Sequence, residues 1–211
     1  MPSPTASVAF YDKHAAQLAR LYDDLEFEQL YSDWFNDQTP VGKALDIGCG
    51  SGRDACWLAS HGWHVTAVEP ATAMRELARH KASEQGIGQE ALRWVDDALP
   101  SLGHVPGDAY QLILVSAVWM HLSTAHRPMA LRRMAQLLAD DGMLVMTMRN
   151  GPSEMDRPMY PVSEVEVRAI AHPMKLSVQR IGAPLRSKDL FGRDEVQWQT
   201  LILRRQPLTP G

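Results

Sequence analysis

The sequence predicts an α/β fold in which helices cover both faces of a doubly wound, mostly parallel sheet. Short continuous apolar runs alternate with segments of helical periodicity, a pattern typical of βαβ units. Three glycines stand within five positions directly after the first apolar run. The 211 residues, 45% of them hydrophobic, are enough to bury one substantial core.

Seven apolar segments have the length and composition of strands. They are residues 44–47, 64–68, 92–95, 111–115, 143–148, 176–182 and 196–203. The first five are short, mostly apolar runs, as expected for parallel strands covered on both faces. The last two follow each other without a helix between them, so we expect a hairpin-like antiparallel pair at the edge of the sheet.

Helical segments separate these strands. They are residues 53–60, 71–84, 124–138 and 163–172. Pro70 precedes the second helix and Gly86 follows it. In the third helix we expect Met129 to share an apolar stripe with its leucines, while Arg127 lies elsewhere. The "DDGM" at 140–143 is predicted to turn the chain into the fifth strand.

The segment before the first strand is rich in aromatic residues and is predicted to form one or two helices over residues 7–35. We expect residues 1–40 to act as a helical lid and residues 41–211 to form a single globular unit. The sequence contains no internal repeat and no long linker.

The glycines of "DIGCGSG" predict a ligand site at the turn from the first strand into its helix. Ligands of doubly wound folds sit at this end of the sheet. Gly48, Gly50 and Gly52 permit unusual backbone angles and close approach of a bulky ligand. A nicotinamide fingerprint would need glycine where Arg53 stands, and the ending of a phosphate-binding P-loop is absent. The loop therefore suits a ligand without a pyrophosphate.

Acidic residues end the next two predicted strands. Glu69, in "VTAVEP", could accept hydrogen bonds from paired ribose hydroxyls, although an ordinary solvated acid is the alternative. In "WVDDALP", Asp97 could accept from an adenine amino group while the Ala98 amide donates to the ring. Asp96 is the rival of Asp97 for this role.

Five segments together resemble the class I S-adenosylmethionine (SAM)-dependent methyltransferases. They are "ALDIGCGSG", "VTAVEP", "DDALP", "YQLILVSAVWMHL" and "LLADDGMLVMT", within residues 44–148. The resemblance implies a Rossmann-like, seven-stranded sheet with one antiparallel strand in an edge region, inside a three-layer αβα sandwich. It implies SAM as the cofactor, Asp46 and Gly48 near its methionine moiety, Glu69 on the ribose and Asp97 near adenine. The usual "PGG" turn of the family is "DDG" here.

The candidate cofactor-binding residues belong to the ends of the first four strands. They are Asp46, Gly48, Cys49, Gly50, Gly52, Glu69, Pro70, Asp96, Asp97, Ala98 and Ser116. A small side chain at Cys49 fits the loop better than a reactive thiol does. The eight histidines are scattered, and the pair in "HGWH" at 61–64 has no companion cysteine or acid at ligand spacing, so we expect no metal.

Methyl transfer depends mainly on alignment and exclusion of water, so a dedicated base is optional. His121, after the fourth strand, is the candidate catalytic base; the alternative is that it orients a loop. Other side chains could line the acceptor site, with helix packing as the alternative for the aromatic ones. They are Tyr11, Tyr31, Trp119, Met120, Arg149 and Tyr160. Arg149 would suit a carboxylate-bearing acceptor, and a surface salt bridge is its alternative.

The net charge and one sequence segment narrow the range of acceptors and partners that we expect. The net charge of −4 disfavours nucleic acid, and "SAVW" stands where methylases of exocyclic amines carry [DN]PP[YFW]. We therefore expect a small-molecule acceptor; a protein acceptor, a noncatalytic SAM-binding protein and a nicotinamide-dependent reductase are the alternatives. No apolar run is long enough for a bilayer and no secretory signal is evident, so we expect a cytoplasmic location. For the oligomeric state the sequence leaves a monomer and a homodimer open.

Overall fold

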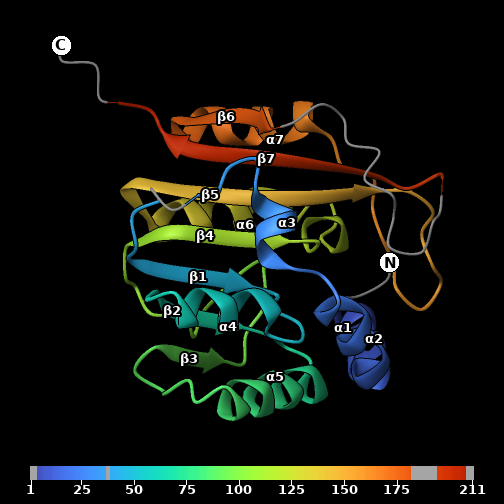
Figure 1. Cartoon of the computed structure of the whole chain (residues 1–211). Coiled ribbons are helices and arrows are strands. Elements are labelled where there is room, and N and C mark those ends of the chain that lie inside the picture. Colours follow the sequence, from blue (N-terminus) through green and yellow to red (C-terminus); the bar gives the residue numbers. More distant parts are fainter. Residues whose placement is uncertain (1–3, 37–38, 182–193, 208–211) are drawn as a thin grey trace.

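The computed structural model describes residues 4–36, 39–181 and 194–207, whose strands form one seven-stranded sheet in the order β3-β2-β1-β4-β5-β7-β6 (Figure 1). The strands are β1 (Lys43–Ile47), β2 (His64–Val68), β3 (Leu92–Val95), β4 (Tyr110–Ser116), β5 (Leu138–Asn150), β6 (Leu176–Ile181) and β7 (Gln197–Arg205). The first five are parallel, whereas β7 runs antiparallel to both β5 and β6. The predicted doubly wound, mostly parallel sheet is confirmed.

The two closing strands do not simply extend the sheet in chain order. β7 inserts between β5 and β6, so the last strand of the chain is internal and β6 occupies the edge. The burial pattern agrees, because the middle of β7 is buried while β6 is largely accessible. The predicted antiparallel pair is therefore present.

Helices cover both faces of the sheet. They are α1 (Pro4–Lys13), α2 (Ala15–Asp23), α3 (Phe27–Tyr31), α4 (Arg53–Ser60), α5 (Thr72–Glu84), α6 (Arg127–Leu137) and α7 (Glu164–Ala171), with short 3-10 turns η1 (Trp119–His121) and η2 (His172–Met174). Two large apolar clusters lie on opposite faces, one under α6 and α7 and the other under α3 and α4. Residues 96–109 contain no helix, and their buried Leu99, Leu102 and Val105 fill the first cluster instead.

The N-terminal segment forms three short helices rather than one or two. α1 and α2 pack on α5 through a small cluster that includes Leu18 and Met74. α3 packs on α4, where Phe27 stacks on Trp57 with ring centroids 3.9 Å apart. The segment therefore contacts the sheet domain at two separate places, because two different apolar surfaces are available to it.

Two details of the prediction around α6 and β5 are wrong. Residues 140–143 do not form a turn but lie inside β5, where pairing jumps from Tyr110↔Leu138 to Leu112↔Met143. This irregularity lets two exposed aspartates remain in the strand. On α6, Met129 is 50% exposed and Arg127 is fully buried, because backbone carbonyls outside the helix accept hydrogen bonds from its guanidinium group.

No helix among the described residues has the length and apolarity that a bilayer-spanning segment requires.

Candidate functional site

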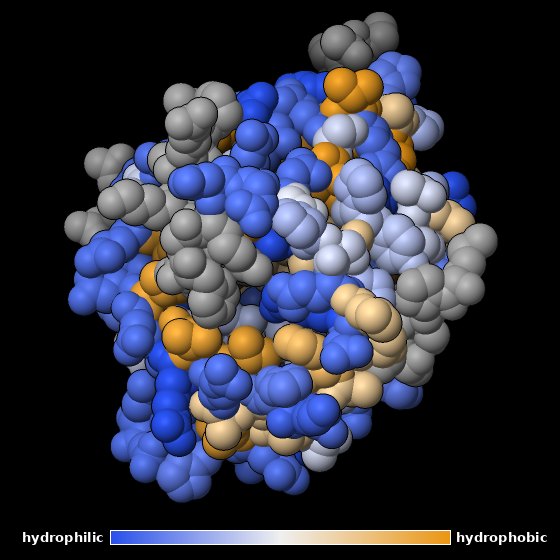
Figure 2. All heavy atoms as spheres, turned by 90° about the vertical axis from the view of Figure 1, so that its right-hand side faces the viewer, coloured by the Kyte–Doolittle hydropathy of each residue, from blue (hydrophilic) through white to orange (hydrophobic). Residues whose placement is uncertain are grey.

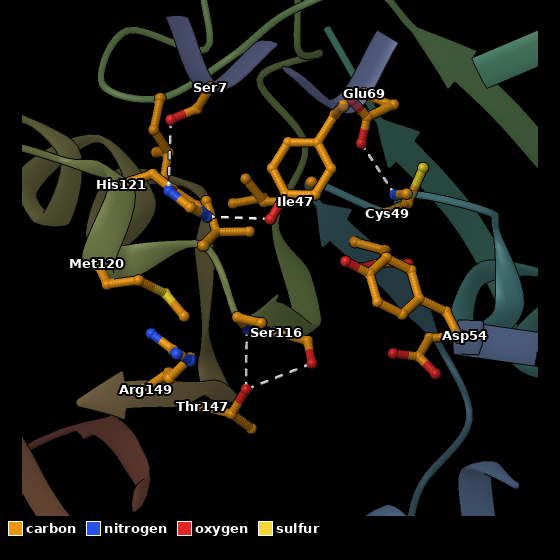
Figure 3. A pocket seen from close by; sticks show the side chains of 18 of the residues that line it. Ser7, Ile47, Cys49, Asp54, Glu69, Ser116, Met120, His121, Thr147 and Arg149 are labelled. Atoms are coloured by element: carbon orange, nitrogen blue, oxygen red, sulfur yellow. Dashed lines mark hydrogen bonds between the residues drawn. The ribbon is translucent and has the colours of Figure 1, made fainter. Parts of the chain in front are cut away.

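A cavity of about 430 Å³ opens at the carboxyl ends of the parallel strands. The sheet order reverses between β1 and β4, and such a switch point is where doubly wound sheets bind ligands. The volume lies within the roughly 300–1,000 Å³ typical of small-molecule sites. In Figure 3, Glu69 and Cys49 lie on one side of the cavity, and His121 and Arg149 on the other.

The glycine loop adopts a backbone that other residues rarely allow. Gly48, Gly50 and Gly52 have φ values of +69°, +54° and +75°. A Cβ on Gly48 would stand 2.5 Å from a methyl group of Val118, whereas a Cβ on Gly50 would meet almost nothing within 4 Å. Gly48 and Gly50 line the cavity; Gly52 does not, and it instead allows close packing against α5.

Glu69 joins the tip of β2 to the glycine loop. Its two carboxylate oxygens accept hydrogen bonds from the amides of Gly50 at 2.9 Å and Ala71 at 2.8 Å. Burial raises the pKa of the carboxyl, while these two hydrogen bonds oppose the rise. The residue is only 6% exposed, so it is not the ordinary solvated acid considered above. Pro70, next in the chain, also lines the cavity.

Asp46 presents an unused acceptor at the end of β1. The side chain is 1% exposed, and its Oδ2 has no hydrogen-bond partner among the described residues. Burial raises its pKa well above the ordinary value, and repulsion by Asp54 adds to the rise. An orphaned carboxylate oxygen on a cavity wall fits a ligand with a cationic amino group.

The two aspartates that follow β3 point in different directions. Asp97 and Ala98 line the cavity, whereas the side chain of Asp96 is 67% exposed and pairs with Arg75 at 2.9 Å. The Ala98 amide donates to Asp97 Oδ1 at 2.7 Å, and the His104 amide donates to Oδ2 at 2.6 Å. Asp97 is therefore held in place by backbone donors, and the geometry favours it over Asp96.

Cys49 lines the cavity beside Glu69. Desolvation raises the pKa of its thiol well above the ordinary value, and repulsion by nearby carboxylates adds to this effect. The thiolate is disfavoured, as expected for a small residue that fits the loop.

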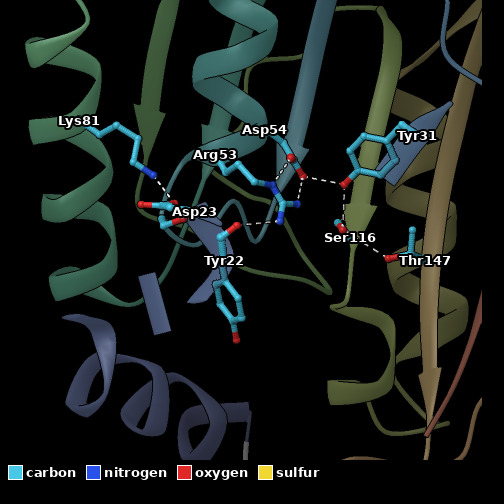
Figure 4. A network of polar contacts seen from close by, with 9 residues as sticks. Tyr22, Asp23, Tyr31, Arg53, Asp54, Lys81, Ser116 and Thr147 are labelled. Atoms are coloured by element: carbon cyan, nitrogen blue, oxygen red, sulfur yellow. Dashed lines mark hydrogen bonds and ion pairs between the residues drawn. The ribbon is translucent and has the colours of Figure 1, made fainter. Parts of the chain in front are cut away.

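A polar network joins the N-terminal helices to the floor of the cavity (Figure 4). The Tyr31 hydroxyl, on α3, lies 2.6 Å from Asp54 Oδ2 and 3.1 Å from Ser116 Oγ. Arg53 holds the same Asp54 carboxylate through two of its nitrogens, at 2.7 and 2.9 Å. Thr147 on β5 completes the network at 3.3 Å from Ser116 Oγ. The network fixes Tyr31 against the start of α4 and the end of β4.

His121 ends η1 and faces the cavity. Its Nδ1 lies 3.1 Å from the Pro158 carbonyl oxygen, and its Nε2 lies 3.1 Å from the Tyr11 hydroxyl of α1. Burial, followed by the positive charges of Arg157 and Arg149, lowers its pKa to about 4. The imidazole is therefore neutral near pH 7 and has one nitrogen that can accept a proton.

The structure divides the remaining acceptor candidates into two groups. Met120 and the buried Arg149 line the cavity, and Arg149 donates from Nη1 to the Pro152 carbonyl at 3.2 Å. Trp119 and Tyr160 are not among the lining residues. Trp119 is fully buried in the core, and the Tyr160 amide donates to the Met120 carbonyl, which ties the following loop to η1.

Several lining residues were not anticipated from the sequence. They include Ser7, Tyr22, Asp54, Thr147, Arg157, Met159 and Trp198. Asp54 could have been suspected because it follows the glycine loop directly. Arg157 lies in a loop without local pattern, and only the fold brings it beside α1, with its guanidinium 5.0 Å from the Phe10 ring.

Within the described part of the chain, no three or more His, Cys, Asp or Glu residues are grouped closely enough to hold a metal ion.

Comparison with known proteins finds a protein-family match in the central part of the chain. Residues 44–142 match the family model described as "Methyltransferase domain". Over 115 residues the chain is 32% identical to the protein-L-isoaspartate O-methyltransferase of Pelodictyon phaeoclathratiforme, an alignment that covers 52% of this chain and 44% of that protein. The chain spans only about half the length of the curated relatives it matches.

Solved structures share the fold over nearly the whole chain. Magnesium protoporphyrin IX methyltransferase from Synechocystis, with bound SAM, is similar at a TM-score of 0.65 and 19% identity, covering 93% of this chain and 84% of that one. The [4+2]-cyclase SpnF is similar at a TM-score of 0.69 and 14% identity, with 97% of each chain covered. At these identities the similarity establishes the fold.

Proposed function

Because the chain carries a methyltransferase domain with the class I, SAM-dependent fold, we propose that it transfers the methyl group of SAM to a small-molecule acceptor. One observation carries this proposal. A single cavity runs from the glycine loop and Glu69 to His121 and Arg149, so a cofactor and an acceptor have adjoining places in it.

The cofactor half of the cavity offers groups for each part of SAM. The unpartnered Asp46 Oδ2 suits the amino group of the methionine moiety, Glu69 suits the ribose hydroxyls, and Asp97 suits the adenine amino group. Each Glu69 oxygen accepts one backbone hydrogen bond and retains a further lone pair for a ribose hydroxyl. When bound, SAM supplies a methyl group made electrophilic by the attached sulfonium.

The protein itself contributes by aligning the two reactants and by excluding water from them. Alignment of two reactants in one site is worth about 7–11 kcal/mol of the activation barrier when the geometry is productive. Ser7, Tyr11 and Tyr22 of α1 and α2 line the cavity, which supports a lid role for residues 1–40 over the domain of residues 41–211. A closed lid excludes water from the reacting atoms.

A small acceptor agrees with the surroundings of the site. Hydrophilic side chains dominate the coloured surface at this end of the molecule, with smaller apolar groups among them (Figure 2). The formal net charge is −4, which does not favour a nucleic acid. A protein acceptor and a noncatalytic SAM-binding role are the alternatives, and the shared fold of a [4+2]-cyclase shows why the reaction itself needs testing.

Calorimetry with SAM, S-adenosylhomocysteine (SAH) and NADH tests the cofactor. We expect SAM and SAH to bind and NADH not to bind. Binding of NADH alone would overturn the proposal in favour of a reductase. Incubation with methyl-labelled SAM and separate pools of small molecules and proteins then distinguishes the acceptors. SAH binding without transfer to any pool would favour the noncatalytic alternative.

Arg149 provides a test of acceptor chemistry. If the acceptor carries a carboxylate, Arg149→Met raises its KM by about 10- to 150-fold, as expected when a charge-assisted hydrogen bond of about 1.5–3 kcal/mol is lost. The control is Arg168→Met on α7, which removes an exposed guanidinium outside the cavity. An unchanged acceptor KM in Arg149→Met would exclude this role.

A further inference from the structure

The hydrogen bonds around His121 define which of its nitrogens carries a proton. Nδ1 lies 3.1 Å from the Pro158 carbonyl oxygen and 3.4 Å from Ser7 Oγ. A carbonyl can only accept a hydrogen bond, so Nδ1 is the protonated nitrogen of the neutral ring. Nε2 therefore carries the lone pair, and a base at this position acts through Nε2.

That lone pair is already engaged by Tyr11. The Tyr11 hydroxyl lies 3.1 Å from Nε2, and the two rings meet edge to face with centroids 5.6 Å apart. An acceptor cannot reach Nε2 directly without displacing this phenol. Tyr11 lines the same cavity, so its oxygen can meet the acceptor instead.

We propose that Tyr11 receives the proton of a hydroxyl-bearing acceptor and passes its own phenolic proton to His121 Nε2. This inference rests on the proposed methyl transfer. The acceptor oxygen gains the methyl group as the bond from sulfur to that methyl breaks with its electron pair left on sulfur. The acceptor proton moves to the Tyr11 oxygen, the Tyr11 proton moves to Nε2, and the positive charge lost from sulfur resides on the imidazolium.

The charges around Tyr11 and His121 link the two proton transfers to the methyl transfer. Burial is the largest effect that disfavours a charged His121, and Arg157 and Arg149 add to it, whereas the hydrogen bond to the Pro158 carbonyl and the charge of Glu154 favour the charged form. Burial also raises the pKa of Tyr11, while Arg157 and Tyr22 oppose the rise. Both members of the pair are therefore neutral before transfer. Loss of the sulfonium charge from the shared cavity removes one repulsion that an imidazolium would otherwise meet there.

The arrangement also selects the nucleophile. A carboxylate oxygen attacks a methyl group without releasing a proton, so it needs no proton acceptor. A hydroxyl must lose its proton as the new bond forms, and a relay beside the cavity serves that need. The pair therefore favours transfer to a hydroxyl oxygen over transfer to a carboxylate oxygen.

Nitrogen NMR of the histidine rings tests the pair without an acceptor. In SAH-loaded protein at pH 7 we expect a neutral His121 with its proton on Nδ1, assigned by its loss in His121→Asn. Tyr11→Phe should move the Nε2 resonance towards that of a nitrogen without a hydrogen bond. The matched control is Tyr110→Phe. It removes the buried Tyr110 hydroxyl, which donates to Thr66 Oγ1 and lies at the start of β4, far along the strand from the cavity. A proton on Nε2, or a resonance insensitive to Tyr11→Phe, overturns the proposal.

The same experiment measures the charge coupling. The pKa of His121 should be about one unit higher in the SAH complex than in the SAM complex, because SAH lacks the sulfonium charge. Equal values in the two complexes would contradict the transfer of charge from sulfur to imidazole.

Methyl transfer to a hydroxyl compound found by the labelled screen tests the relay itself. Tyr11→Phe and His121→Asn should each slow single-turnover transfer about 10²-fold or more, with the double variant no slower than the slower single one within about twofold. SAH affinity should stay within about twofold in all three, since the pair acts on the acceptor. The relay is overturned if the rate losses of the two single variants add up in the double variant, or if neither variant slows transfer.

The two proposals fail in different ways. Absence of SAM and SAH binding refutes the proposed function, whatever the NMR spectra show. Intact SAH binding with transfer only to nitrogen or sulfur acceptors refutes the relay and leaves the proposed function standing.

Discussion

The two halves of the cavity are built in different ways. In the cofactor half, the contacts that hold the site join residues close in sequence: Gly50 and Glu69 are 19 positions apart, and Asp97 and Ala98 are neighbours. In the acceptor half, Tyr11 and His121 are 110 positions apart, and His121 and Pro158 are 37 apart. One half is encoded by local motifs, whereas the other is assembled by the fold.

This difference extends to the kind of interaction. Backbone conformation and amide donors fix the cofactor half, as at the glycine loop and Glu69. In the acceptor half, the His121 side chain is fixed by hydrogen bonds to two other segments, the side chains of α1 and the backbone carbonyl of Pro158. Substitutions should therefore affect the two halves independently, and the following experiments test that separation.

The largest expected effect concerns the support of the acceptor half. Arg127 is fully buried and donates to the carbonyls of Leu122 and Pro161, and it pairs with Glu166. Arg127→Met leaves these acceptors without their donor and should lower the free energy of unfolding by about 3 kcal/mol. Urea denaturation measures it. The exposed pair of Arg168 is the control, and Arg168→Met should cost at most about 0.5 kcal/mol. Equal losses would contradict this account.

Close packing under the glycine loop gives the next effect. A Cβ at Gly52, whose φ is +75°, would stand 2.8 Å from the Cβ of Ala78, so Gly52→Ala should cost about 2–3 kcal/mol of stability. Gly86 has a φ of +70° and no atom within 4 Å of a Cβ, so Gly86→Ala should cost only about 1 kcal/mol. The difference between the two isolates the close approach to α5. If the two variants unfold at the same urea concentration, the close packing of Gly52 on α5 contributes nothing to the free energy of unfolding.

Acid should lower the free energy of unfolding through protonation of His121 in the acceptor half. The pKa of its imidazole is 6.5 in the absence of the fold and about 4 in the native protein, so the unfolded chain binds the proton first as pH falls. The stability due to the neutral ring is present above pH 6.5 and is lost as pH falls towards 4. From pH 7 to pH 5 the loss should be about 2 kcal/mol.

Comparison with His121→Asn isolates this contribution. Asp46 and Glu69 have raised pKa values and act in the opposite direction, since their burial costs less once they are protonated. They are present in both proteins and cancel in the difference. Urea curves at pH 7 and pH 5 that shift equally in wild type and His121→Asn would refute the prediction.

The smallest effect distinguishes two acids in the cofactor half. Glu69→Gln replaces a carboxylate beside the glycine loop and should weaken SAM binding about tenfold, measured by calorimetry. Asp96→Asn alters an exposed side chain outside the cavity lining and should change affinity by less than about twofold. Comparable losses would restore Asp96 as a cofactor residue.

The contrast also explains which sequence predictions succeeded. Predicted α4, β2 and β3 coincide with the observed elements, because hydrophobic periodicity and glycines act within a few residues. The sequence predicts a turn at 140–143, but these residues lie in β5, because only the pairing with β4 reveals the irregular strand. Trp119 was expected near the acceptor, yet the short η1 turn directs it into the core.

The sequence by itself determined the alternation of strands and helices, the bare glycine loop and the acids at the strand ends, because each depends on neighbouring residues. Only the tertiary structure decided that β7 lies between β5 and β6, that Arg127 is buried, and that Tyr11, His121 and Pro158 meet. Such contacts join segments whose separation along the chain carries no pattern. Burial and hydrogen-bond satisfaction across the whole fold select them.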